Sequence, residues 1–181
     1  MPVGQGNSKA GNDMFGSEFP DQNISSNGGS TKSLEERLVS KKWNERASAY
    51  EELAEQIKKV SKGKDALLYD HSEGFNGFLK DSNPGALEKA VDLYIEFIKK
   101  ADNSIVNNMK SATIDLLISK SISHLKPSLQ EKGMEAICCI IENTEDFEGV
   151  SEVVCKQMLS TNVKVSNFCQ IIVKYLLIYD G

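Results

Sequence analysis

Apolar residues recur with the spacing of an α-helix through almost the whole chain from Leu34 onward. The clearest segment begins at Asn83 and Pro84, which suit an N-cap and a first helical position. The residues that follow make one apolar stripe at i, i+3 and i+4 spacing, formed by Leu87, Ala90, Val91, Tyr94, Ile95 and Ile98. No run alternates with a period of two for long enough to indicate a strand. The pattern therefore predicts an all-α fold.

These helical segments come in pairs, and the pairs repeat at a nearly constant interval. The second helix of each pair carries a small residue, followed four positions later by a larger apolar one. The small residues are 41, 43 and 36 positions apart, and the instances are Ala49 with Leu53, Ala90 with Tyr94, Gly133 with Ile137, and Cys169 with Val173. Arrays of HEAT and armadillo type have periods of about 40 to 47 residues, and a small residue lets one helix cross its neighbour closely. We predict an α-solenoid of about four HEAT-type helical hairpins, with a closed helical bundle as the alternative.

The first part of the sequence has a different composition, which changes near Ser33. Gly, Ser, Asn and Asp dominate residues 1–33, and the apolar residues there follow no period. Such a segment buries too little apolar surface to offset the entropy that it would lose on ordering. We therefore predict a disordered N-terminal tail over residues 1–33 and a helical repeat domain over residues 34–181.

The short connections inside the helix pairs are polar, and several contain lysine. They span residues 40–46, 80–84, 123–128 and 160–164. Equivalent turns of a solenoid lie along one edge, so these turns predict a ridge with local positive charge. The whole chain has a formal net charge of −5, which argues against sequence-independent binding of nucleic acid. A polar ridge of this kind suits an extended protein surface better than a small ligand.

Trp43 is the one tryptophan of the chain, and it follows Lys41 and Lys42 in the first of these connections. Two interpretations carry equal weight. The indole covers the open end of the array, or it is an exposed aromatic anchor of the type favoured at binding hot spots.

The sequence lacks a convincing constellation for catalysis or metal binding. Adjacent carboxylates such as Glu35 and Glu36 point in different directions on a helix, and a glycine-rich phosphate loop after a strand is absent. No cysteine lies in a CxxC pair, and all fall inside apolar helical patterns, where thiols are usually inert: Cys138, Cys139, Cys155 and Cys169. We predict a cytoplasmic protein with reduced thiols, no enzyme activity, no cofactor and no metal. It has no run of about 18 apolar residues, so no membrane-spanning helix is expected.

A more specific pattern opens the helical region. Residues 33–53, which read SLEERLVSKKWNERASAYEEL, resemble the start of a TOG domain, the tubulin-binding HEAT array of the microtubule polymerase family. That family opens with a Leu-Glu-Glu-Arg-Leu helix, a turn with Trp, an Arg, and a helix containing Ala-Tyr-Glu-Glu-Leu. Here these features are residues 34–38, Trp43, Arg46 and residues 49–53. Residues 81–83 with 88–90, and residues 131–138, are also similar to the family pattern, and the arrangement is most like a first, N-terminal TOG domain.

The resemblance implies a flat array of six HEAT repeats whose intra-repeat turns bind the curved, unpolymerised αβ-tubulin heterodimer. It implies that the tryptophan inserts against β-tubulin and that basic residues of later turns face acidic tubulin surface. Carried over residue by residue, the implied tubulin contacts are Trp43, Arg46, Ser82, Asn83, Lys126, Asn162 and Lys164. The implied role is in a microtubule polymerase or plus-end regulator, in the cytoplasm at microtubule ends, the spindle or a microtubule-organising centre. A HEAT-repeat adaptor for a different protein is the alternative.

Three features depart from the family pattern. Asn44 follows the tryptophan where the family often has lysine, and Ser128, Leu129 and Gln130 replace much of the lysine of the third turn. Only about four of the six repeats are present, so we expect a domain truncated at its C-terminus. Truncation of a repeat array exposes an apolar face. We predict that this face is exposed or self-associates, and that it includes some of Phe168, Ile172, Leu176 and Tyr179.

Overall fold

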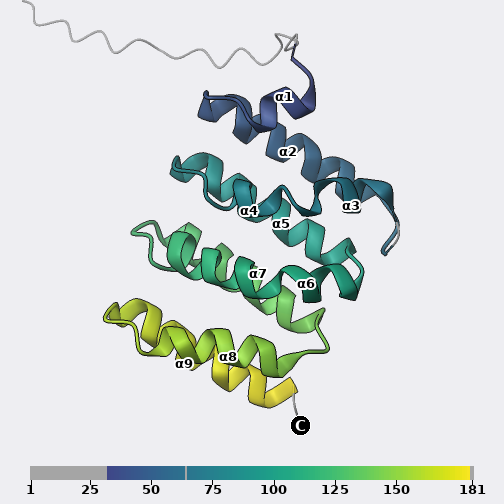
Figure 1. Ribbon diagram of the computed structural model, residues 1–181. Coiled ribbons are helices and arrows are strands. Elements are labelled where there is room, and N and C mark those ends of the chain that lie inside the picture. Colours follow the sequence, from purple (N-terminus) through teal and green to yellow (C-terminus); the bar gives the residue numbers. More distant parts are fainter. Residues whose placement is uncertain (1–31, 64, 180–181) are drawn as a thin grey trace, which may run out of the picture. The chain divides into compact units, whose positions relative to one another are not determined.

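The computed structural model describes residues 32–63 and 65–179 and shows an array of helix pairs (Figure 1). The first pair is α1 (Leu34–Leu38) and α2 (Trp43–Lys59), and in the second pair α3 (Ala66–Ser72) and α4 (Phe75–Phe78) precede α5 (Pro84–Lys100). In the third pair, α6 (Asn103–Leu116) continues into a π-helix, η1 (Leu117–Ile122), before α7 (Pro127–Glu142). The fourth pair is α8 (Phe147–Met158) and α9 (Val163–Tyr179). The disorder predicted for residues 1–33 falls, up to residue 31, outside the described residues.

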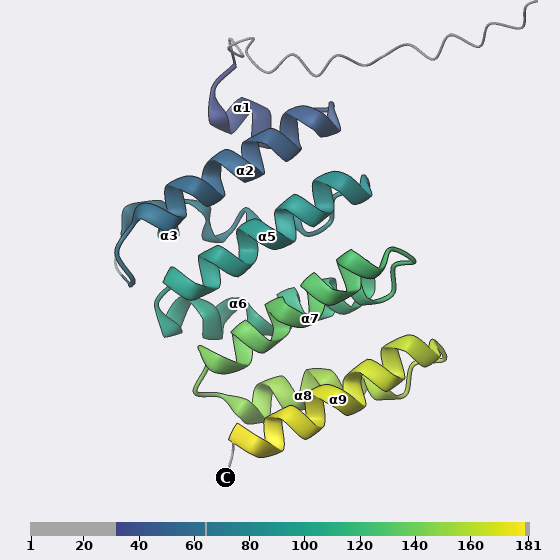
Figure 2. The same ribbon diagram turned by 180° about the vertical axis from the view of Figure 1, so that it is seen from behind.

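The helix pairs stack one after another into an open α-solenoid (Figures 1 and 2). The second helices α2, α5, α7 and α9 follow one another on the face seen in Figure 2, and the first helices lie behind them. The all-α solenoid of HEAT-type hairpins predicted from the repeat spacing is therefore confirmed, and the alternative of a closed bundle is wrong.

Side-chain caps fix where several of these helices begin. Ser33 and Glu36 make a capping box at the start of α1. The Asn83 side chain accepts hydrogen bonds from the N–H groups of Gly85 and Ala86, at 2.9 and 3.1 Å, next to the proline that begins α5. A cap of this kind contributes about 1 kcal/mol to helix stability. The cap predicted at Asn83 is thus confirmed.

The first two repeats share a cluster of aromatic rings. The ring centroid of Phe75 in α4 lies 4.4 Å from that of Phe97 and 5.2 Å from that of Tyr94, both in α5. Tyr50 of α2 and Phe78 of α4 extend the cluster, with ring centroids 5.1 Å apart. All five rings are buried. Aromatic pairs in such geometries add about 0.5–1.5 kcal/mol beyond the area that they bury, so this cluster fastens the second repeat to the first.

The small residues repeated in the second helices are all buried: Ala49, Ala90, Gly133 and Cys169. Gly133 shows why a small residue is needed. A Cβ atom there would lie 2.8 Å from the Cβ of Ser121 and 2.9 Å from the Cδ1 of Ile122, both in η1. The glycine therefore allows α7 to pack directly on the π-helix, which fits the close helix crossing predicted at the small residue.

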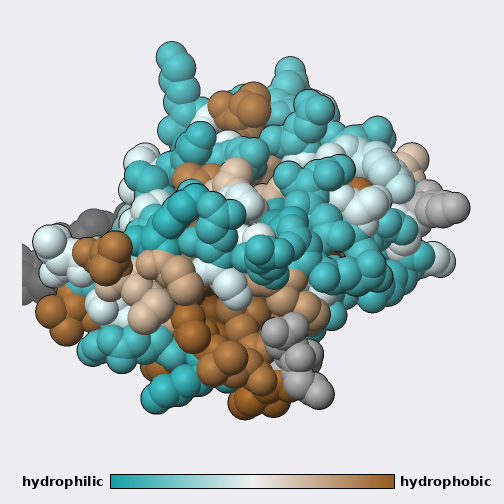
Figure 3. All heavy atoms as spheres, turned by 60° about the horizontal axis from the view of Figure 1, so that its bottom comes forward, coloured by the Kyte–Doolittle hydropathy of each residue, from teal (hydrophilic) through white to brown (hydrophobic). Residues whose placement is uncertain are grey.

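Helix α9 presents a different face to solvent from the one predicted. Phe168, Ile172 and Leu176 are buried, because this stripe packs against α8 and η1. The prediction that these three residues are exposed is therefore wrong, and the side chain of Tyr179 lies outside the described residues. Figure 3 looks onto this end of the array, where hydrophobic side chains do gather at the surface. The exposed apolar residues of α9 lie outside the buried stripe and are Val163, Ile171, Leu177 and Ile178.

Candidate functional site

The four turns inside the helix pairs lie along one edge of the array, the left edge in Figure 1 and the right edge in Figure 2. We call this edge the turn ridge. Turn 1 is residues 39–42, turn 2 is residues 79–83, turn 3 is residues 123–126 and turn 4 is residues 159–162. All seven predicted contact residues lie in these turns or at the start of the helix that follows, so the fold brings them to one edge.

Trp43 occupies the first position of α2 and not the interior of turn 1. The residue is 50% exposed. A Cβ atom on Gly85, in the first turn of α5, would lie 3.4 Å from the Cζ3 atom of Trp43. The indole therefore packs against the next repeat where a glycine leaves room, while the rest of the ring faces solvent. This favours an exposed anchor over a cover for the open end of the array.

Arg46 is engaged within the chain by an ion pair with Asp81 of turn 2. Its Nε donates to Oδ2 of Asp81 at 2.6 Å, its Nη2 donates to Oδ1 at 2.7 Å, and its Nη1 donates to the carbonyl of Ser40 at 2.7 Å. The Asp81 carboxylate also accepts from the Tyr50 hydroxyl at 3.3 Å and from the N–H of Asn83 at 2.9 Å. We call this network the latch. It gives Arg46 a structural role, because the guanidinium joins turn 1 to turn 2, and the partner contact of Arg46 stays a prediction.

The latch sets the protonation states of its members. The Asp81 side chain is only 1% exposed. Burial pulls its pKa upward, but the hydrogen bonds from Arg46 and from the N–H of Asn83 outweigh burial and hold the pKa below its ordinary value. The hydrogen bond to Asp81 raises the pKa of Arg46. Burial, and then the charge of Asp81, raise the pKa of Tyr50. At neutral pH the latch is therefore a charged pair beside a neutral phenol.

Two residues of turn 2, Ser82 and Asn83, have different roles. Ser82 is exposed, so its hydroxyl is available at the ridge. Asn83 is half-buried, and its side-chain oxygen is occupied by the cap of α5. Asn83 therefore fixes the turn, and Ser82 presents a hydrogen-bonding group from it.

Turn 3 is tied back to the second repeat through Lys126. This lysine is exposed, but its ammonium group pairs with Glu88 of α5. Lys132 of α7 contacts the same carboxylate at 3.5 Å and reaches Asp92 at 2.6 Å. The hydrogen bond from Lys126 is the main cause that lowers the pKa of Glu88. A partner that contacts Lys126 must therefore compete with Glu88.

Turn 4 is held by hydrogen bonds within its own segment. The Ser160 hydroxyl accepts from the N–H of Asn162 at 3.2 Å, and the Asn162 side chain accepts from the N–H of Lys164 at 3.0 Å. Asn162 and Lys164 are both exposed. Within residues 32–63 and 65–179, Lys164 makes no ion pair, so its charge is available at the ridge.

Three further lysines, in the turns or next to them, were not among the predicted contacts. Lys41, Lys80 and Lys120 are exposed, and in the part of the chain that the structure describes none of them makes an ion pair. Lys42, by contrast, pairs with Glu45 at 3.3 Å. Lys41 and Lys80 lie in connections whose lysine content was visible in the sequence. Lys120 lies in the π-helix, which the helical periodicity did not reveal.

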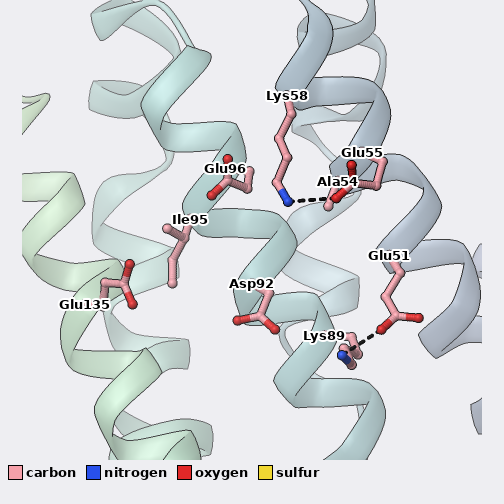
Figure 4. Close-up of a pocket in the computed structure, with 9 residues that line it drawn as sticks. All are labelled: Glu51, Ala54, Glu55, Lys58, Lys89, Asp92, Ile95, Glu96 and Glu135. Atoms are coloured by element: carbon pink, nitrogen blue, oxygen red, sulfur yellow. Dashed lines mark hydrogen bonds and ion pairs between the residues drawn. The ribbon is translucent and has the colours of Figure 1, made fainter.

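The lysines on the face made by the second helices are paired, in contrast to several lysines of the ridge. A groove of about 500 Å³ lies between α2, α5 and α7 (Figure 4). Its lysines are paired inside it, because Lys58 donates to Glu55 at 2.7 Å and Lys89 contacts Glu51 at 2.6 Å. Three more carboxylates line the groove, and each is within reach of a lysine: Asp92 pairs with Lys132 at 2.6 Å, and Glu96 and Glu135 lie 3.2 and 3.9 Å from Lys99. The unpaired lysines of the turn ridge therefore make it the more favourable face for an acidic partner.

The described residues contain no cluster of His, Cys, Asp or Glu that could hold a metal ion. None of the helices in the described ranges combines the length and hydrophobicity needed to cross a bilayer. Burial raises the pKa of the Cys139 thiol to about 11 and also raises that of Cys169, which makes both poor nucleophiles. Cys155 is exposed, so the expectation that all four thiols are inert within apolar helical patterns is wrong in the placement of Cys155.

Residues 29–178 match the family model described as XMAP215/Dis1/CLASP, TOG domain. Among curated proteins, the chain is 29% identical over 133 residues to Centrosomal protein 224 of Dictyostelium discoideum. It is 27% identical over 112 residues to the spindle pole body component alp14 of Schizosaccharomyces pombe. The matches cover 74% and 60% of this chain but 6% and 14% of those proteins, so the chain spans a small part of their length.

Solved structures share the fold. One match is a structure that describes tubulin recruitment and assembly by microtubule polymerases with tumor overexpressed gene (TOG) domain arrays. Its TM-score is 0.67 at 19% sequence identity, and the match covers 75% of this chain and 28% of the matched chain. A designed armadillo repeat protein matches with a TM-score of 0.54 at 15% identity, over 75% of this chain and 60% of that chain. At these identities the similarity concerns the fold alone.

Proposed function

The chain belongs to the XMAP215/Dis1/CLASP family of TOG domains, and on that basis we propose that its turn ridge binds curved, unpolymerised αβ-tubulin heterodimers. The module would serve in a microtubule polymerase or plus-end regulator in the cytoplasm, at microtubule ends, the spindle or a microtubule-organising centre. The names of two relatives refer to the centrosome and to the spindle pole body, which supports this location.

One observation carries the proposal: Trp43 stands half exposed at one end of the ridge, next to Lys41 and Lys42. A large aromatic side chain with a polar rim is the typical composition of a binding hot spot. The unpaired lysines of the ridge attract an acidic protein surface, whereas the lysines of the groove in Figure 4 are already paired with carboxylates. These features favour docking along the edge of the array.

The latch supports selectivity for the shape of the partner. Because Arg46 and Asp81 join turns 1 and 2, these turns have a fixed relation and fit one curvature of a partner better than another. A protein that binds one conformation of tubulin more tightly stabilises that conformation and releases the dimer when it straightens. This activity requires differential affinity and no covalent chemistry.

Gel filtration of the chain with αβ-tubulin tests the proposal. We expect the wild-type chain to co-elute with tubulin at micromolar concentration and Trp43→Ala to lose co-elution. Truncation of a hot-spot aromatic costs about 2 kcal/mol or more, which is roughly a 30-fold loss of affinity. Tyr69→Ala is a matched control, because Tyr69 is 47% exposed on α3, away from the turn ridge (Figure 1).

Two outcomes would contradict the proposal. The first is a wild-type chain that does not shift tubulin, and the second is equal binding by Trp43→Ala and Tyr69→Ala. Melting curves recorded by circular dichroism show whether each variant is folded. If the chain does not bind tubulin but binds another protein in a way that requires Trp43, it is a HEAT-repeat adaptor.

A further inference from the structure

We propose that a notch between turns 2 and 3 receives a carboxylate side chain of the partner protein. The notch has a volume of about 360 Å³. One wall comes from turn 2 and the start of α5, and the other comes from the end of η1 and turn 3. This inference rests on the proposed function and adds a subsite to the turn ridge, in which Ser82 is the one residue shared with the predicted contacts.

Both walls of the notch provide hydrogen-bond donors. Lys120 is exposed and has no ion-pair partner among the residues that the structure describes. The Nδ1 atom of His124 accepts a hydrogen bond from the N–H of Lys126 at 3.0 Å. A neutral His124 therefore carries its proton on Nε2 and acts as a donor there. Ser82 adds an exposed hydroxyl group from the opposite wall.

The groups of the notch that could compete for these donors are already engaged. The Asp81 carboxylate is neutralised by Arg46 within the latch. The hydroxyl groups of Ser119 and Ser123 donate to backbone carbonyls of the preceding turn, at 3.2 and 2.9 Å. Donors are therefore in excess, which suits an acceptor with negative charge. Hydrogen bonds from charged donors to a carboxylate are about twice as strong as neutral ones.

The notch also has an apolar side. Pro84 and the buried Leu87 belong to its lining. Low polarity beside a charged pair reduces the screening of that pair by solvent. An Asp or Glu side chain, with its short apolar stem and terminal carboxylate, matches both parts of the notch.

Lys120 reaches the notch from the exposed side of η1. Within η1, Ser119 and Lys120 are exposed, while their neighbours are buried: Leu117, Ile118, Ser121 and Ile122. One pair of residues is thus left at the surface beside turn 3. Gly133 of α7 receives the other side of η1. Single π-turns inside helices are frequent at functional sites.

Charge reversal at Lys120 tests the notch. Affinity for αβ-tubulin is measured by fluorescence anisotropy for the wild-type chain, Lys120→Glu and Lys120→Ala. We expect a loss of about tenfold or more for Lys120→Glu and of roughly threefold for Lys120→Ala, with both effects smaller at high salt. Lys59→Glu is the matched control and should bind within about twofold of wild type. Lys59 is also exposed near a helix C-terminus, but at the opposite edge (Figure 1).

The outcomes separate this inference from the proposed function. If Lys120→Glu and Lys59→Glu weaken binding equally, or neither weakens it, the notch is wrong and the tubulin-binding ridge stands. If the wild-type chain does not bind tubulin, both proposals fail. If circular dichroism shows that Lys120→Glu is unfolded, Lys120→Ala decides, and unchanged affinity of that variant overturns the notch.

Discussion

The first two turns of the ridge and its last turn are held in place by different interactions. Arg46, at the start of α2, donates two hydrogen bonds of 2.6 and 2.7 Å to Asp81, which lies 35 positions later in turn 2. In turn 4, the side chains of Ser160 and Asn162 accept hydrogen bonds from N–H groups only two positions away. Hydrogen bonds between the first and second repeats thus hold turns 1 and 2 together. The position of turn 4, by contrast, depends on how α8 and α9 pack.

This difference in how the turns are held affects the conformational entropy that is lost when a partner binds. Turns that are already fixed relative to each other lose little conformational entropy when a partner docks. We therefore expect turns 1 and 2 to act as one preformed contact surface and turn 4 to adjust to the partner. Changes at the latch should reduce stability and binding together, and changes at turn 4 should have smaller effects on both.

The largest effect should come from Arg46→Ala. This substitution leaves the Asp81 carboxylate buried without its charged partner, and we expect it to lower the free energy of unfolding by about 3 kcal/mol. Urea unfolding followed by circular dichroism measures the change. Arg37→Ala is the control, because the partner of Arg37, Glu52, is 45% exposed, and exposed pairs contribute about 1 kcal/mol or less. An equal decrease in the free energy of unfolding in the two variants would show that the latch stabilises the fold no more than an exposed ion pair does.

Acid should release the latch. The pKa of Asp81 in the folded chain lies below its ordinary value, and that of an unfolded Asp is about 3.9. The latch therefore stabilises the fold fully above about pH 5, and this stabilisation is lost as the pH falls through the folded-state pKa. Asp81→Asn has no such carboxylate, so its melting temperature should fall less than that of the wild type between about pH 6 and pH 3. Parallel falls would contradict this account of the latch.

The helix caps give a smaller and more local comparison. Asn83 accepts hydrogen bonds from two N–H groups of α5, and Asn162 accepts one from α9. Asn83→Ala should cost about 1 kcal/mol of stability and weaken tubulin binding, whereas Asn162→Ala should cost less stability and weaken binding less. Asn83→Ser retains a capping oxygen and should restore most of the loss. A larger effect at Asn162 would reverse the order proposed for the two turns.

The smallest effect on stability is expected at the end of the array that carries turn 4. Leu177 is 70% exposed, so Leu177→Ser should change the free energy of unfolding by no more than about 0.5 kcal/mol. Self-association through this end stays a prediction, and Leu177→Ser should reduce it in sedimentation velocity. Leu125→Ser is the control, because Leu125 is also highly exposed, at 85%, but lies in turn 3. Identical sedimentation of both variants and the wild type would count against self-association here.

The parts of the fold that depend on local spacing could be predicted from the sequence. Helical periodicity and the recurring small residue predicted the paired helices, and Asn83 with Pro84 predicted the start of α5. The π-helix was missed because one wider turn changes the apolar period too little to be noticed. Lys120 was also missed, since it lies in that helical segment and outside the polar connections that were predicted to form the ridge.

Features that depend on contacts between distant residues could not be predicted in this way. The ion pair of Arg46 with Asp81 was not predicted, because a pairing across 35 positions leaves no local pattern. The exposed face of α9 was misassigned because this helix has apolar residues on more than one side. Periodicity identifies Phe168, Ile172 and Leu176 as a stripe, but only packing against α8 and η1 shows that this stripe is the buried one.

The aromatic cluster and the latch affect the order in which the repeats fold during synthesis. Both are complete once the residues up to the end of α5 are available. Repeats in an array mainly contact their neighbours, so folding can begin in one part and propagate. On a ribosome, which delivers the N-terminal residues first, we expect the first two repeats to fold while α6 to α9 are still being synthesised. Each later hairpin would then pack against the repeat that has already folded, as it emerges from the ribosome.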